Sequence, residues 1–537
     1  MRFSFFSCLA FLVSHVFIIC KSQALDFSLD YDNFIFFHWK GGLTSSSIIL
    51  KVFPLQSLLD NVLLQTFIAL YTKPTSSGVQ DPIVIPVNFE NEEFPVAKIK
   101  LESLNPNTKY FYSFIFAQSS SFDSQTFAQI YLEQTPQEFS FHTLGAAFSP
   151  YNFTFASSSC ADTGSNSSIF TTLKNLDLQF FLHLGDLHYM NIHENEPERF
   201  YDAYYKVFSS KTQKPFLQST PIFYVWDDHD FGPDNSNGTS PARPASTTAY
   251  KKFVPYDTLK NYLPIDISSV SLDDYLPPEP SGPYGIFRSF VVGRCLFIMM
   301  DLRSFKDIKP LDVLGPEQTV WLENQLKFAG KNPHILQAFL ISSFSWIHID
   351  GKTEWRPYKD VQEQISGWIE EYIYGNGKQI MMISGDAHML ALDDGTNNIY
   401  GHFPVIQTAS LDSVPSCKGG PYSHGLFSGI EHFGLIQVVD DGADKICIKI
   451  NLKEREESLI VYDTCNKELY PPNQKSCPIV TPVVNQKKTS PSWRFFIIAV
   501  VISAIVLLFK TYKEANPGNE DGRNRGSYVE MTVHPKE

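Results

Sequence analysis

The chain reads Phe180-Phe181-Leu182-His183-Leu184-Gly185-Asp186-Leu187-His188-Tyr189 at the point where a short apolar run meets a polar turn. The apolar run at 180–184 is typical of a buried strand. The turn that follows carries an acid, a histidine and a tyrosine. Reactive side chains gather at the carboxyl ends of strands in α/β proteins. The stretch therefore predicts an α/β domain with its site at the strand ends.

Other predicted strands end in the same way. Apolar runs at 153–156, 222–226 and 380–383 lead directly into turns with hard and borderline metal ligands. These turns read Ser157-Ser158-Ser159-Cys160-Ala161-Asp162, Trp226-Asp227-Asp228-His229-Asp230-Phe231-Gly232 and Ile383-Ser384-Gly385-Asp386-Ala387-His388. Strands at 296–300 and 337–341 and helices at 316–328 and 358–374 complete the α/β pattern.

Each turn taken alone has a plainer interpretation. An Asp after Gly is common in turns and at helix N-caps, and a lone His is more often a hydrogen-bonded residue than a ligand. Cys160 alone would be a small buried hydrophobe or half of a disulfide. The sequence Asp227-Asp228-His229-Asp230 resists such an interpretation, because three carboxylates in four positions repel one another unless a cation neutralises them. We therefore expect a metal site.

The region before this domain has an all-β pattern. Short apolar or alternating runs separated by Gly, Pro, Asn and Ser fill residues 25–145. The segment 104–112 resembles the corner of fibronectin type III sandwiches, in which a tyrosine hydroxyl bonds back to the preceding turn. We expect a fibronectin III-like β-sandwich here, as a spacer or as a ligand-binding module.

Both ends of the chain carry apolar stretches that indicate targeting. Residues 1–24 combine Arg2, an apolar run at 5–20 and a small-x-small site, which predicts a cleaved signal peptide, with an uncleaved signal-anchor as the alternative. Residues 493–512 predict one transmembrane helix, with a removed lipid-anchor signal as the alternative. A stalk at 479–492 precedes it and a tail at 513–537 follows it. We expect a single-pass type I membrane protein whose catalytic domain is extracellular or lumenal.

Composition limits the function classes. The 537 residues are 43% hydrophobic and 19% charged, which is typical of folded domains, and the net charge of -14 argues against nucleic-acid binding. Three sequons, at Asn152, Asn166 and Asn237, fit a secreted glycoprotein. Six cysteines remain after the signal peptide. We expect a buried thiol at Cys295, no disulfide partner for Cys160, and two disulfides of open pairing among Cys417, Cys447, Cys465 and Cys477.

The order of these motifs resembles a known family. Ser-Cys, Gly-Asp-x-x-Tyr, Trp-Asp-Asp-His-Asp, Asp-x-Arg and Gly-Asp-x-His follow one another as in the PhoD-like (alkaline phosphatase D) branch of the calcineurin-like metallophosphoesterases. The resemblance implies a catalytic domain at 150–478, with a β-sandwich flanked by helices. One loop departs from the family pattern: Ser342-Ser343-Phe344-Ser345-Trp346 stands where Ser-x-x-Gln is usual.

The resemblance also implies two metals and their ligands. Iron would be held by Cys160, Asp186, Tyr189 and His388, and calcium or another divalent ion would share Asp186 and use Asp228 and Asp386. Thiolate and phenolate suit trivalent iron, whereas oxygen ligands suit the harder ion. We also place Asp227 among the metal-site residues.

Three further residues are expected to act on the substrate. His229 would stabilise or protonate the leaving oxygen, oriented by Asp230. Arg303 would clamp a phosphate oxygen or, alternatively, form a salt bridge with Asp301.

The predicted function is the hydrolysis of phosphate monoesters or diesters by a metal-activated water outside the cytosol. An enzymatic alternative is a dedicated phosphodiesterase for lipid or glycan phosphates. A non-enzymatic alternative is a membrane-anchored binding or adhesion protein on a degenerate phosphatase scaffold.

Overall fold

The computed structural model describes residues 35–55, 65–74, 82–90, 92–117, 129–131, 134, 136–256, 285–347, 355–466 and 469–470. The chain divides into the units Met1–Cys477 and Pro478–Glu537. The predicted signal peptide, stalk, span and tail all lie outside the described residues. Within those ranges, no helix combines the length and the apolar character needed to cross a membrane.

The N-terminal region is all-β, as expected, and forms two small sheets with the strand orders β1-β2-β5 and β4-β3-β6-β7. The predicted tyrosine corner is present, because the Asn105 backbone N–H donates to the Tyr110 hydroxyl at 2.8 Å. The strands are β1 (Ile35–Gly41), β2 (Ile48–Pro54), β3 (Gln65–Tyr71), β4 (Ile83–Val87), β5 (Ala97–Leu101), β6 (Lys109–Ala117) and β7 (Phe139–His142).

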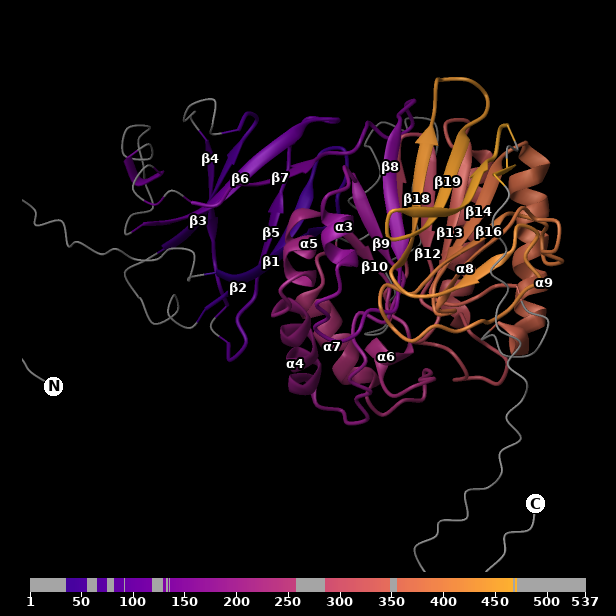
Figure 1. The fold of residues 1–537 in the computed structure, drawn as a ribbon, viewed down its shortest axis with the longest axis horizontal. Coiled ribbons are helices and arrows are strands. Elements are labelled where there is room, and N and C mark those ends of the chain that lie inside the picture. Colours follow the sequence, from indigo (N-terminus) through magenta and orange to yellow (C-terminus); the bar gives the residue numbers. More distant parts are fainter. Residues whose placement is uncertain are drawn as a thin grey trace, which may run out of the picture. The chain divides into compact units, whose positions relative to one another are not determined.

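Two larger sheets follow and pack face to face (Figure 1). The first has the order β10-β9-β8-β18-β19-β20-β21, with β8 (Phe153–Ser158), β9 (Phe180–His183), β10 (Ile222–Tyr224), β18 (His432–Val439), β19 (Cys447–Glu454), β20 (Glu457–Asp463) and β21 (Leu469–Tyr470). The second has the order β11-β12-β13-β14-β16-β15-β17, with β11 (Arg288–Val292), β12 (Cys295–Met299), β13 (Gln337–Ser342), β14 (Gln379–Ser384), β15 (Met389–Asp393), β16 (Val405–Thr408) and β17 (Leu426–Ser428).

Aromatic side chains fill the space between these sheets. The ring of Phe155 on β8 lies 5.4 Å from Phe297 on β12 and 5.8 Å from Phe339 on β13, both edge to face. All three rings are buried, and aromatic pairs in this geometry stabilise a core beyond the area they bury. Strands β8, β9 and β10 are mutually parallel, as are β12, β13, β14 and β16. The parallel strands bring the loops at their carboxyl ends to one edge.

Helices lie beside both sheets (Figure 1). Those near the first sheet are α3 (Ile169–Lys174), α4 (Pro197–Phe208), α5 (Gln213–Ser219), α6 (Asp228–Phe231) and α7 (Arg243–Phe253). Beside the second sheet lie α8 (Gly315–Lys331) and α9 (Lys359–Trp368), which match the two predicted helices, and α9 continues into a π-helical turn at Ile369–Ile373. Short 3-10 turns occupy Arg356–Tyr358 and Tyr374–Asn376.

The N-terminal sheets share a core with the catalytic domain. The indole N–H of Trp39 on β1 donates to the Phe253 carbonyl at 2.8 Å, and Phe37 stacks on Phe208 with ring centroids 4.0 Å apart. All four side chains are buried in one hydrophobic cluster. The N-terminal region therefore packs on α4 and α7 rather than serving only as a spacer.

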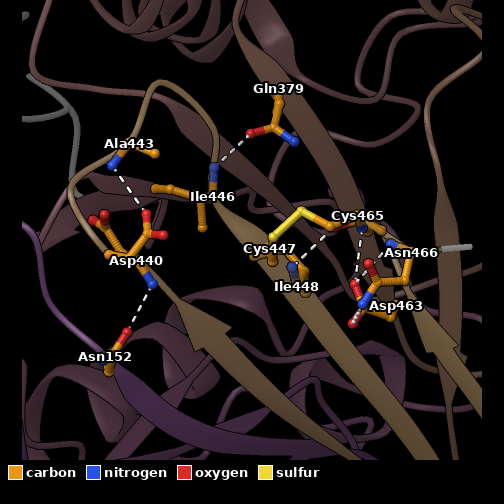
Figure 2. Close-up of a disulfide and its surroundings, with 12 residues drawn as sticks. Asn152, Gln379, Asp440, Ala443, Ile446, Cys447, Ile448, Asp463, Cys465 and Asn466 are labelled. Carbon is orange, nitrogen blue, oxygen red and sulfur yellow. Dashed lines mark hydrogen bonds between the residues drawn. A yellow bond between two sulfur atoms is a disulfide. The ribbon is translucent and has the colours of Figure 1, made fainter.

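The cysteines agree with the expected pattern where the structure describes them. Cys447 at the start of β19 is bonded to Cys465, just after β20 (Figure 2). Cys417 is disulfide-bonded as well. Cys160 and Cys295 are free and buried. Cys477 lies outside the described residues.

Candidate metal centre

Four loops at the edge of the two sheets carry the predicted ligands. Cys160 follows β8, Asp186 follows β9, Asp228 follows β10 and the turn from Asp386 follows β14. One close approach depends on a glycine: a Cβ on Gly185, whose φ is +102°, would lie 2.4 Å from the Asp227 Cβ. Only glycine lets the β9 and β10 loops come this near to each other.

The first group of ligands combines sulfur, oxygen and nitrogen. Ligand atoms of Cys160, Asp186 and His388 all lie within 4.8 Å of one another. The Tyr189 hydroxyl joins them, 3.0 Å from Asp186 Oδ2 and 3.1 Å from His388 Nε2. The other ring nitrogen of His388, Nδ1, contacts the Val414 carbonyl, which leaves Nε2 facing the group. The structure thus brings together all four residues of the predicted first site.

The second group shares a residue with the first. Ligand atoms of Asp186, Asp228 and His229 also lie within 4.8 Å of one another. Asp386 belongs to neither group, but its carboxylate Oδ2 is buried and has no hydrogen-bond partner among the described residues. A carboxylate common to both groups is the geometry that lets one side chain bridge two ions.

Known proteins share this domain. Residues 155–410 match the sequence model of the family described as PhoD-like phosphatase. This part of the chain is a PhoD-like phosphatase domain. It makes the protein a phosphoric ester hydrolase. Beyond the matched residues, the first large sheet continues to β21 and the second to β17.

Two solved structures resemble this chain in fold. "Structure of PhoD" superposes with a TM-score of 0.54 at 15% identity, over 83% of this chain and 94% of that one. A purple acid phosphatase from yellow lupin (Lupinus luteus) seeds gives a TM-score of 0.52 at 12% identity, over 84% of this chain and 78% of that one. No curated protein sequence matches the chain.

Electrostatics of the PhoD-like domain favour bound cations. Burial, and then the neighbouring carboxylates of Asp228 and Asp227, raise the pKa of Asp186 well above its usual range. Burial and the Asp186 charge likewise raise the pKa of the Cys160 thiol. A cation among these groups would reverse both effects and keep them ionised. The donor set and the partnerless Asp386 Oδ2 therefore fit a pair of metal ions.

Arg303 corrects one expectation about the substrate. Its side chain is fully buried, its Nε donates to Asp227 Oδ1 at 2.6 Å, and its guanidinium lies over the Phe344 ring. Its terminal nitrogen lies 3.6 Å from Asp228 Oδ1. The predicted alternative was an ion pair between the Arg303 side chain and Asp301. That is also wrong, because the Arg303 backbone N–H, and not its guanidinium, donates to the Asp301 carboxylate. Arg303 therefore supports the Asp228 loop from behind and does not face a substrate.

The same contacts place Asp227 behind the ligands. Its Oδ1 also accepts a hydrogen bond from the Ser343 hydroxyl at 2.7 Å, and it caps the N-terminus of α6. None of the groups of three possible ligands found among the described residues includes it. Metal binding by Asp227 stays a prediction. The loop from Ser342 to Trp346 therefore contributes the Ser343 hydroxyl, which holds the Asp227 carboxylate. This role could not be predicted from the sequence, because the loop lacks the usual family motif.

Asp230 corrects another expectation. Its carboxylate does not orient His229 but accepts backbone N–H groups of Asp186 at 2.6 Å, Leu187 at 2.7 Å and Asp227 at 3.0 Å. Carboxylates that collect several backbone donors lock the loop that supplies them. Asp230 therefore fixes the turn that presents Asp186.

Two residues missed by the sequence analysis hold the His229 ring. His229 Nδ1 lies 2.6 Å from Asn191 Oδ1, and Nε2 lies 3.6 Å from Asp234 Oδ1. The ring also packs on Tyr189 with centroids 4.2 Å apart. Both ring nitrogens therefore face oxygen atoms of neighbouring side chains. The proximity of Asn191 to the Gly-Asp-x-x-Tyr motif was the one signal in the sequence that could have found it.

Proposed function

We propose that the protein hydrolyses phosphate monoesters or diesters with a binuclear metal centre. The observation that carries the proposal is the position of Asp186 in both groups of ligands. Cys160, Tyr189 and His388 would hold an iron ion with it, because soft and phenolate donors suit iron. Asp228 and Asp386 would hold calcium or another divalent ion, which prefers oxygen ligands.

The bound metals would supply an activated water and neutralise charge on the phosphoryl oxygens. The protein's own residues would do the rest. His229 would give its proton to the leaving oxygen as the bond to phosphorus breaks, so that the product leaves as an alcohol. Asn191 and Asp234 would hold the ring in position. Asp230 and Arg303 would act indirectly, by holding the loops that present Asp186 and Asp228.

The first prediction concerns the metal centre. We expect the purified full-length protein to contain two metal ions per chain by elemental analysis and to hydrolyse p-nitrophenyl phosphate or its bis-ester. Asp186→Asn should lose metal and reduce kcat about 10³-fold or more, because the shared ligand then has one charged oxygen fewer. His229→Ala should reduce kcat by about 10²–10⁴-fold, more with an alkyl than with a nitrophenyl leaving group.

A metal-free wild-type protein would contradict the proposal, as would variants that match its rate. The latter result would favour a binding protein on the same scaffold. Comparing kcat/KM for the monoester and the diester would also separate a phosphomonoesterase from a dedicated phosphodiesterase.

We further propose that the PhoD-like domain faces the extracellular or lumenal side and is tethered by the 493–512 span. The apolar segments at both ends and the Cys447–Cys465 disulfide support this, since disulfides persist in oxidising compartments. Protease protection of an epitope tag placed after Glu537 and removal of N-glycans with a glycosidase would test the orientation. A tag that is accessible on intact cells would contradict it.

A further inference from the structure

A lysine from a loop remote in sequence lies at the metal centre. The Nζ atom of Lys418 donates to Asp386 Oδ1 at 2.7 Å and to the Asp386 carbonyl at 3.3 Å. Lys418 belongs to the segment between β16 and β17, whereas Asp386 follows β14. Its side chain is 32% exposed, so part of it remains open to solvent. Lys418 therefore adds a positive charge to the ligand turn from an accessible side.

The loop that carries Lys418 is fastened over this turn. The Ser416 backbone N–H donates to the His388 carbonyl at 3.1 Å, and its hydroxyl donates to the Ala387 carbonyl at 2.8 Å. The adjacent residue, Cys417, is disulfide-bonded. These contacts restrict the main chain on the N-terminal side of Lys418, so its ammonium group is presented with little freedom. A fixed ammonium loses less entropy when it binds a ligand.

Within the described ranges, two cationic side chains pair with the carboxylates expected to bind metal. They differ in their exposure to solvent. Arg303 is fully buried and its guanidinium is occupied by Asp227, Asp228 and the Ser236 carbonyl. Lys418 is partly exposed, and an ammonium has three N–H donors, of which Asp386 takes two. The third N–H can donate to a further oxygen. The cation expected to clamp the phosphate is therefore better matched by Lys418 than by Arg303.

We propose that Lys418 binds a non-bridging oxygen of the substrate's phosphoryl group and of the inorganic phosphate product. The inference rests on the proposed function, because it needs a phosphate ester at the centre formed by Asp186 and its neighbours. A lysine is a compact point charge that suits a phosphoryl oxygen. Its contact with Asp386 would place that charge beside the second metal site, where the oxygens of the substrate must lie.

The test compares Lys418→Met with Lys418→Arg in the full-length protein. We expect Lys418→Met to keep both metals but to raise KM for p-nitrophenyl phosphate and the inhibition constant of inorganic phosphate by about 10- to 100-fold, the range for a lost hydrogen bond to a charged group. Lys418→Arg should recover part of the phosphate inhibition. A second neutral variant, Lys418→Gln, covers the case in which the methionine variant fails to fold, as thermal unfolding would reveal.

A matched control lies near the opposite end of the strand that precedes Asp386. Lys378 lies just before the opposite end of β14 and donates a single hydrogen bond to the Asn332 carbonyl. Lys378→Met should therefore leave KM and phosphate inhibition unchanged.

Two outcomes would overturn the inference. Unchanged phosphate inhibition in Lys418→Met and Lys418→Gln would show that Lys418 does not touch phosphate, and loss of metal from folded variants would show that it only positions Asp386. Failure of the proposed function has a different signature, namely a wild-type protein without metal or activity. Calorimetric titration of that protein and of Lys418→Met with inorganic phosphate would still test the inference, since equal binding would refute it.

Discussion

Four of the ligand residues have a backbone conformation that side-chain-bearing residues rarely adopt. Cys160, Asp186, Asp386 and His388 have φ angles of 62°, 53°, 60° and 50°. Left-handed conformations at non-glycine residues cost about 1–3 kcal/mol each and are kept where the surrounding structure enforces them. They turn the side chains of separate loops toward one another. These strained turns coincide with the place where thiol, carboxylate and imidazole groups cluster.

At the same scale, Gly185 is the residue whose replacement we expect to be most harmful. Gly185→Ala would place a methyl group 2.4 Å from the Asp227 Cβ, at a φ of +102° that alanine rarely adopts. We expect the Asp186 turn to move, with loss of most bound metal and a decrease of several kcal/mol in the free energy of unfolding, measured by chemical denaturation.

The control for this prediction is Gly367→Ala. A Cβ at that position in α9 meets nothing within 4 Å, so the change should be neutral or stabilising by about 0.5–1 kcal/mol. Equal metal content in the two variants would contradict the need for a glycine at position 185.

Single residues also show how far the sequence alone could reach. Short motifs at the ends of apolar runs identified Cys160, Asp186, Tyr189 and His388, because their residue types and their place after strands follow from local sequence. The direction of a side chain does not follow from it. The motifs correctly placed Arg303 and Asp230 near the metal centre but predicted the wrong partners for them. Burial directs Arg303 to Asp227, and Asp230 accepts hydrogen bonds from backbone N–H groups. Lys418 and Asn191 belong to no motif, and only the folded chain brings Lys418 to Asp386.

At the scale of elements, the short helix α6 links two strand ends. Asp227 caps this helix, and the Asp230 side chain reaches back to the Asp227 N–H at 3.0 Å, which forms a capping box. The same carboxylate accepts the Asp186 N–H at 2.6 Å. One helical turn therefore sets the separation between the loops after β9 and β10, and with it the distance between Asp186 and Asp228.

This arrangement predicts the effect of a near-isosteric change. Asp230→Asn would replace an acceptor oxygen by an NH₂ group that faces backbone N–H donors, so we expect at least one buried donor to lose its partner. The cost should be about 1–3 kcal/mol in the free energy of unfolding, with weaker metal retention during dialysis against a chelator. Asp202→Asn on the exposed face of α4 is the control and should change neither quantity. Unchanged metal retention in Asp230→Asn would contradict this role.

At the scale of the whole molecule, a buried lysine in the N-terminal sheets links stability to pH. Lys40 on β1 is fully buried and donates to the Ser140 carbonyl on β7 at 2.7 Å. Burial lowers its pKa to about 7. In the unfolded chain, lysine titrates near its ordinary pKa of about 10.4. Between pH 7 and this value, the unfolded chain therefore binds more protons than the folded protein, and the free energy of unfolding must increase with pH.

The corresponding prediction compares two pH values. Between pH 7 and pH 9 the Lys40 contribution to the free energy of unfolding should increase by roughly 2 kcal/mol. Lys40→Met should remove this increase, whereas Lys109→Met at an exposed position on β6 should keep it, as measured by denaturant unfolding at both pH values. Parallel pH profiles for the wild type and Lys40→Met would contradict the prediction.

The aromatic contact between β1 and the helices α4 and α7 affects what happens when the chain is cleaved between β7 and β8. Phe37 and Trp39 are buried against Phe208 and Phe253, so the two regions adhere without relying on the peptide that joins β7 to β8. A nick in that connection would leave two fragments held together by their buried rings. The enzyme would then survive the cut as a noncovalent complex, whereas a chain that lacked β1 would expose the same rings and aggregate.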